Sequence, residues 1–270
     1  DEGARVRFHP MGLPSFTKLC LSTGTRSWVD RRNFLREIQA LLGSLRGDAP
    51  AVQKDRAAFE LAKLSQNSDE DEYMQAIWLT NGIPLLVALV REGTEMQKDH
   101  ATIALFYASH DTYNQKEIVT AGGISALLAL LGQDATNLQK ENAMLMLKNL
   151  AAAKGDDCAA IVDAGVIPPL VALLNGVATD LQKAHAMDLL MSLTITRNAD
   201  RDAAIRNAIA VEGGISALEA LASGGATELQ KQMATNTLKL INRRKPLPGL
   251  DFLPVYNLQR ARGRTRGADG

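Results

Sequence analysis

Apolar and polar positions along the chain fall into blocks that recur. In residues 122–151 a Gly pair opens an apolar run, a Thr-x-x-Gln segment follows, and a longer run of Ala, Leu and Met closes the block. A Gln-Lys pair marks the same point of each recurrence, at Gln53-Lys54, Gln97-Lys98, Gln139-Lys140, Gln182-Lys183 and Gln230-Lys231. The intervals between these glutamines are 44, 42, 43 and 48 residues. A period in the low forties is typical of helical repeats that stack into a solenoid.

Each recurrence predicts one short helix followed by two longer ones. The short helix ends at a Gly, as in residues 118–123, where a left-handed C-cap would stop it without steric cost. The second helix opens one residue after a marker Ile, with a proline at Pro84 and Pro168 or a serine at Ser125 and Ser216 that we expect to cap it. The third helix begins with a Thr-x-x-Gln capping box at Thr94, Thr136, Thr179 and Thr227.

The first unit departs from this pattern. Its opening segment, residues 28–45, has apolar residues at helical spacing, which predicts a helix. Pro50 occupies the position of the capping threonine, so we expect no capping box before Gln53. The acidic residues 68–72 precede a short apolar helix that ends near Leu79, where carboxylates favour a helix N-terminus.

The blocks resemble the armadillo repeat over about Phe34 to Asn242. GIPLLVALV, GGISALLALL, GVIPPLVALL and GGISALEALA resemble its second helix, and LQKENAMLMLKNLA resembles its third. The resemblance implies an all-α, right-handed α-solenoid superhelix of armadillo type, and HEAT repeats are the nearest alternative. We predict an array over residues 28–242 with about five units, of which the first and last are atypical.

The two ends of the chain lack the period. Residues 1–27 are predicted to be a flexible N-terminal extension, and residues 243–270 a basic, disordered tail or linker with a net charge of +5. The chain begins with Asp1 and not with Met, which we interpret as a fragment of a longer, multidomain protein. No segment has the apolar core of a signal peptide or the ~18 apolar residues needed to span a bilayer.

The composition argues against several classes of function. The formal net charge is zero, so we expect no nucleic-acid binding except through the basic tail. Only two cysteines occur, far apart at Cys20 and Cys158, which argues against a disulfide framework or a Cys-rich zinc site. An intracellular location, cytoplasmic or nuclear, is the resulting expectation.

Catalytic motifs are missing from the sequence. It contains no G-x-S-x-G, G-x-x-x-x-G-K-[ST], G-x-G-x-x-G or H-E-x-x-H. His100 and His185 are equivalent in the repeat but two units apart, roughly 20 Å, which is too far to share a zinc ion. We predict no enzyme activity, no catalytic or metal residue and no cofactor.

The resemblance places a binding surface on the concave side, which the third helices line in armadillo proteins. Importin-α-like members carry there a Trp and, four residues later, an Asn that hold an extended basic peptide. The Trp position here holds Phe59, Ile103, Leu145, Asp188 and Asn236. The Asn position holds Lys63, Tyr107, Asn149, Ser192 and Leu240. With one Asn and no Trp at these positions, an import adaptor is the third alternative.

The five lysines after the marker glutamines form a second repeated feature. Two interpretations stay open: solvated first-turn residues, or a basic column for an acidic partner. The predicted groove residues are Lys54, Lys98, Lys140, Lys183, Lys231, Tyr107, Asn149, His100 and His185.

The predicted function is a non-catalytic, protein-binding scaffold or adaptor whose partner is a protein or peptide, with an acidic or phosphorylated segment as the specific hypothesis. No small-molecule substrate is expected. The first alternative is the substrate-recognition region of a larger protein, such as a U-box ubiquitin ligase. The sequence names neither partner, pathway nor oligomeric state.

Overall fold

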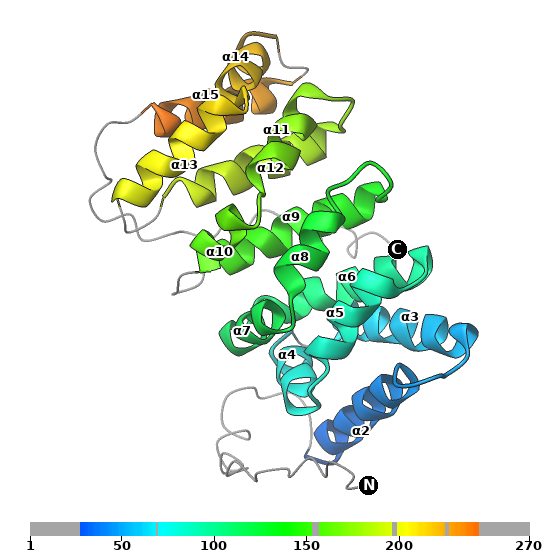
Figure 1. Cartoon of the computed structure of the whole chain (residues 1–270). Helices are drawn as coiled ribbons and strands as arrows, with labels where there is room; N and C mark the ends of the chain where they lie inside the picture. The colour runs from blue at the N-terminus through cyan, green and yellow to red at the C-terminus, as the bar shows by residue number, and fades with distance from the viewer. Residues whose placement is uncertain (1–27, 69, 153–156, 196–198, 225–226, 243–270) are drawn as a thin grey trace, which may run out of the picture.

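The computed structural model describes residues 28–242 except 69, 153–156, 196–198 and 225–226. All regular elements in this part of the chain are α-helices (Figure 1). They are α2 (Trp28–Ser44), α3 (Ala51–Asn67), α4 (Glu70–Leu79), α5 (Ile83–Glu92), α6 (Glu95–Ala108), α7 (Thr112–Thr120), α8 (Gly123–Ala129), α9 (Asn137–Ala151), α10 (Asp157–Asp163), α11 (Ile167–Asn175), α12 (Asp180–Leu193), α13 (Ala199–Val211), α14 (Gly214–Gly224) and α15 (Glu228–Ile241). The predicted extension over 1–27 and tail over 243–270 lie outside the described residues.

The helices group into the three-helix units that the period predicts, but the expectation of a short first helix is wrong for α7 and α13, which are longer than α8 and α14. Four complete units, α4–α6, α7–α9, α10–α12 and α13–α15, follow the shorter pair α2–α3. Each third helix packs on its neighbours in sequence order, α3 on α6, α6 on α9, α9 on α12 and α12 on α15. Figure 1 shows the units following one another along the array, from α2 at one end to α15 at the other. The all-α solenoid prediction is confirmed.

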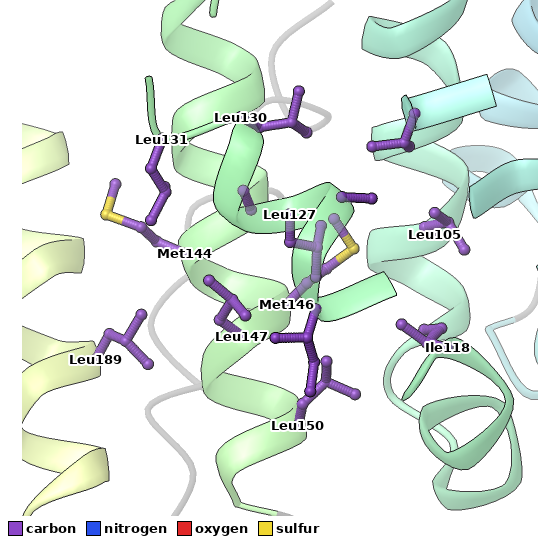
Figure 2. Packing of buried hydrophobic residues seen from close by; sticks show 14 of the residues in the cluster. Leu105, Ile118, Leu127, Leu130, Leu131, Met144, Met146, Leu147, Leu150 and Leu189 are labelled. Atoms are coloured by element: carbon purple, nitrogen blue, oxygen red, sulfur yellow. The ribbon is translucent and has the colours of Figure 1, made fainter. Parts of the chain in front are cut away.

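One hydrophobic core runs through the whole array, from Phe34 to Ile241. Figure 2 shows its centre, where Met144, Met146 and Leu147 of α9 lie between Leu105 of α6 and Leu189 of α12. These five side chains are at most 1% exposed. Because each such side chain stabilises the fold by about 1.5–3 kcal/mol when fully buried, a unit depends on both of its neighbours.

Small residues allow the third helices to approach one another. One equivalent position is alanine throughout, at Ala57, Ala101, Ala143, Ala186 and Ala234, and each of these side chains is buried. Since alanine adds no bulk beyond Cβ, the adjacent helix can pack directly on it. The alternation of alanine with Leu and Met therefore reflects contacts between units as well as within them.

Capping of the third helices follows the prediction. Thr94, Thr136 and Thr179 are N-caps, each in a complete capping box with the Gln three residues later. Thr227 also caps its helix, with its hydroxyl accepting from the backbone N–H of Gln230. Pro50 makes no side-chain cap, as expected for the atypical first unit.

The glycine pairs serve two different needs. The first glycine takes the left-handed conformation after the first helix of the unit, with φ of 78° at Gly122. The second must lack a side chain, because a Cβ on Gly123 would lie 2.4 Å from Cγ2 of Ile118. The expectation that serines cap the second helices is wrong: α8 begins at Gly123 and α14 at Gly214, so Ser125 and Ser216 already lie inside these helices.

Membrane-spanning and metal-binding features can be assessed for the described residues. Among them no single helix has both the length and the apolar character to cross a bilayer; Asp71–Leu79 and Ile83–Glu92 meet that criterion only as a pair, bent by 89°. Within the same residues, no three His, Cys, Asp or Glu side chains are grouped as metal ligands. Cys158 is a buried free thiol, and burial raises its pKa.

Replacing Thr136 by Ala tests the third-helix boundary. The substitution removes the hydroxyl that accepts from the backbone N–H of Gln139, so the free energy of unfolding should fall by about 0.5–2 kcal/mol. Chemical denaturation of Thr136→Ala measures this loss. Thr112→Ala is the control, because Thr112 is exposed and its helix is capped by Asp111 instead. Equal stability of the two variants would contradict the assigned start of α9.

Candidate functional site

The third helices α3, α6, α9, α12 and α15 lie side by side and share one exposed side, which we call the third-helix face. The opposite side of each helix is buried against the second helices and the neighbouring units. On α6 this side includes the exposed Met96 and the half-buried Ile103, which lie seven residues apart and therefore on the same side of the helix. The repeat thus presents equivalent side chains in columns that run across the helices.

A ladder of glutamine amides connects the units beneath this face. Gln97 donates from Nε2 to Oδ1 of Asp55 at 2.6 Å, and Gln139 donates to Oδ1 of Asp99 at 2.6 Å. In the next two units, Gln182 donates to Oδ1 of Asn137 at 2.9 Å, and Gln230 donates to Oδ1 of Asp180 at 3.0 Å. All four glutamines are buried. The sequence explains these residues by the capping box alone, but the structure also gives each amide a bond to the preceding unit, which for Gln97, Gln139 and Gln182 is additional to the capping box.

The N-terminal half of the third-helix face is aromatic. Phe59 of α3 is 48% exposed, and its ring centroid lies 5.3 Å from that of His100 on α6, in an edge-to-face arrangement. Farther along α6, Phe106 lies 5.3 Å from Tyr107 and 4.9 Å from His110, ring to ring. The structure thus joins the predicted residues His100 and Tyr107 to aromatic neighbours that offer apolar area with polar edges.

The C-terminal half is more polar and is cross-linked between units. Asn149 donates from Nδ2 to Oγ of Ser109 at 2.9 Å, so this predicted residue also joins α9 to the end of the preceding unit. Lys148 of α9 forms a salt bridge with Asp188 of α12. Burial lowers the pKa of His185, while the nearby Asp188 acts in the opposite direction. Contacts between units therefore fix the positions of these side chains without a ligand.

The lysine column lies on another side of the same helices. Lys98 and Met96 are two residues apart, so their side chains diverge by about 160° around the helix axis. Lys98 pairs with Glu95 at 3.0 Å and Lys231 with Glu228 at 2.8 Å, each within one helix. The ammonium group of Lys140 donates to the backbone carbonyl of Gln133, in the loop before α9, at 3.4 Å. A binding role for the column, including the equivalent Lys54 and Lys183, stays a prediction.

A second column, of exposed aliphatic side chains, was missed by the sequence interpretation. Its members are the residues before each marker glutamine: Val52, Met96, Leu138, Leu181 and Leu229. Their exposed fractions are 77%, 60%, 43%, 50% and 64% respectively. Alignment of the repeats on the glutamines shows an aliphatic residue at this position every time, and that signal was available in the sequence. We call these five residues the aliphatic column.

Solved structures of similar shape include designed armadillo repeat proteins. A designed armadillo repeat protein in complex with the peptide (KR)4 superposes with a TM-score of 0.67 at 20% identity, covering 79% of this chain and 86% of that one. A computationally designed armadillo protein for modular peptide recognition gives 0.66 at 20% identity, covering 80% and 95%. An engineered protein gives 0.64 at 19% identity, covering 85% and 99%. These likenesses establish the fold, which is of the armadillo type.

Comparison by sequence adds no relative. No protein-family model matches the chain, and no curated protein matches it. The armadillo assignment therefore depends on the repeat pattern in the sequence and on the arrangement of the helices. The resemblance proposed from the repeated blocks is confirmed at the level of fold.

Replacing Gln139 by Ala tests the glutamine ladder. The change removes the bonds to Thr136 and Asp99 together, in a residue that is only 1% exposed, so the free energy of unfolding should fall by about 1–3 kcal/mol. Gln133→Ala is the control, because Gln133 is exposed and its side chain should contribute within about 0.5 kcal/mol. Chemical denaturation of both variants checks the difference, and similar midpoints would show that the ladder does not stabilise the array.

Proposed function

We propose that this chain is a non-catalytic scaffold that binds an extended peptide segment of a partner protein on the third-helix face. The observation that carries the proposal is the position equivalent to Phe59, which holds an apolar residue in three adjacent helices, at Phe59, Ile103 and Leu145. These residues belong to helices held rigidly by a common core, so the surface they form is pre-organised. Pre-organisation lowers the entropy lost when a ligand binds.

The surroundings of these residues suit a peptide. Aromatic side chains are enriched where protein partners bind most strongly, and Phe59 with His100 and Tyr107 supplies such an anchor. Asn149, which is partly exposed, places a side-chain amide on the same face, and such a group can bond a peptide backbone. The proposal is supported further by its structural neighbours, one of which was designed for peptide recognition and another of which holds a peptide.

The same face would serve a free-standing scaffold or the recognition region of a larger protein. A U-box in the full-length polypeptide would favour the second role, in which the array selects substrates for ubiquitin transfer. An import adaptor would need the Trp and Asn residues that hold a basic peptide. At those positions Asp188 is paired with Lys148, and Asn149 already bonds Ser109.

A peptide library displayed on phage and selected on the 270-residue chain tests the proposal. Selected peptides are then titrated against Phe59→Ala and Ile103→Ala by isothermal calorimetry. Loss of an anchor should weaken binding by about 2 kcal/mol or more. Val211→Ala is the matched control, because Val211 is 75% exposed but belongs to α13, a first helix. The proposal would be contradicted if the selected peptides bound the two face variants with unchanged affinity, or if the library yielded no binders.

The lysine column suggests a second ligand chemistry, an acidic or phosphorylated segment. Five equivalent lysines support it, although Lys98 and Lys231 already neutralise a carboxylate of their own helix. Reversal of Lys98, Lys140 and Lys183 to Glu should abolish binding of an acidic peptide and leave the fold intact, because first-turn carboxylates suit a helix N-terminus. Calorimetry at low and at physiological salt measures the effect, since screening should mimic the reversal. Affinity that depends on neither salt nor the lysines would refute this chemistry.

A further inference from the structure

The aliphatic column is a repeated, solvent-exposed apolar feature with no structural task in the described chain. Single exposed aliphatic residues are normal on protein surfaces. Here, however, all five units expose one at the same position of the third helix, with exposed fractions between 43% and 77%. The residues that hold the units together are instead the buried glutamine and alanine of the same helices. The column is therefore available to a partner.

Carboxylates flank the column. Asp55 and Asp99 lie one helical turn after Val52 and Met96, and Asp180 directly precedes Leu181. The donors to Asp55 and Asp99 in the described chain are amides and hydroxyls, which are neutral. Asp180 likewise accepts from the neutral amide of a glutamine. The glutamine ladder holds these three carboxylates in place beside the apolar side chains.

The lysine column points elsewhere, whereas Arg56, next to Asp55 and one helical turn after Val52, places a cation beside the column in the first unit. The lysine after each marker glutamine leaves the helix about 160° from the aliphatic residue before that glutamine. Two of these lysines, Lys98 and Lys231, pair with Glu95 and Glu228 of their own helices. Beyond this first unit, the edge of the third-helix face that contains the aliphatic column is therefore apolar and negative.

The spacing of the column selects the shape of a ligand. Neighbouring helices lie about 8–10 Å apart, which is the expected step from one aliphatic residue to the next. A polyproline II segment has three residues per turn and rises 3.1 Å per residue, so every third side chain lies on one edge, about 9.3 Å apart. A β-strand repeats every second residue, about 6.6 Å, which does not match the step.

We infer that the aliphatic column binds an extended, polyproline-II-like segment of a partner protein that carries an aliphatic residue at every third position and Arg or Lys between them. Its aliphatic side chains would cover the column while its cations face Asp99 and Asp180. The inference rests on the proposed function, because the column forms one edge of the third-helix face, and it specifies the chemistry of the ligand.

The test uses the full chain and a synthetic peptide of five Leu-Pro-Arg triplets, one for each position of the column. Binding is measured by fluorescence anisotropy at low and at physiological salt. Peptides of Leu-Pro-Glu and of Ser-Pro-Arg triplets are the matched controls, which lose the charge match and the apolar match respectively. We expect the first peptide to bind more tightly than either control by about tenfold or more, and less tightly as salt rises.

Two variants of the protein locate the binding site. Met96→Ser, Leu138→Ser and Leu181→Ser combined should weaken the Leu-Pro-Arg peptide by about tenfold or more, whereas Val211→Ser should have no effect. Asp99→Asn with Asp180→Asn keeps an oxygen acceptor for Gln139 and Gln230 but removes the charge, and should reduce both the affinity and its salt dependence. Circular dichroism verifies that each variant retains its helicity.

The outcomes separate this inference from the proposed function. If library-selected peptides bind through Phe59 and Ile103 while Leu-Pro-Arg peptides do not bind, the inference is wrong and the proposed function stands. If no peptide binds in either assay, both are wrong. Concentration-dependent dimerisation that the triple serine variant abolishes would mean that a second copy covers the column, which also overturns the inference.

Discussion

The structure depends on the packing of each third helix against the third helix of the next unit. A single unit of three short helices cannot bury its apolar face alone, and stacking supplies the missing partner on both sides. Buried alanines such as Ala143 bring the helices together, and the glutamine ladder adds a directional bond at each step. Hydrophobic burial provides most of the stabilisation, while the amide bonds fix which residues face each other, because a buried amide without a partner is costly.

The same constraint creates the surface that we assign to function. Because one side of every third helix is committed to the core, the opposite side is left exposed, and the repeat places equivalent residues in columns. The columns differ in chemistry: apolar and aromatic beside Phe59, aliphatic at Met96 and Leu138, and cationic on another side of the helices at Lys98. A partner would meet a fixed array of side chains, which is how a stacked fold recognises an extended segment without a catalytic centre.

Much of the fold could be predicted from the sequence because its signals are local. The Thr-x-x-Gln boxes set the starts of the third helices, and the glycine after the first helix of the unit takes the predicted left-handed conformation at Gly122. The predicted caps at Ser125 and Ser216 were wrong because each helix starts two residues earlier, at a glycine. In α8 this glycine packs so closely on Ile118 that a Cβ would not fit. Such a contact depends on tertiary structure and leaves no separate mark in the sequence.

The candidate site was less accessible to prediction, because contacts between units decide it. Nothing local indicates that Gln97 reaches Asp55 or that Asn149 bonds Ser109, since about forty residues separate the partners in each pair. The direction of Lys98 follows from helix geometry once the buried Gln97 is known, but the sequence alone left two interpretations of the lysines open. The aliphatic column is visible in the alignment of the units, but only the structure shows that its side chains are exposed rather than part of the core.

Deleting one complete unit tests the central claim most directly, that the chain is a linear array whose units depend only on their neighbours. Removal of residues 122–164 joins Ala121 to Gly165 and would bring Gln182 of α12 opposite Asp99 of α6. Thermal melting followed by circular dichroism should show a shorter, less stable protein that still melts cooperatively with helical structure. A control deletion of about half a period, residues 101–121, removes the end of α6 and all of α7, breaks the register of the repeat and should not fold. Cooperative melting of both deletions, or of neither, would contradict the account.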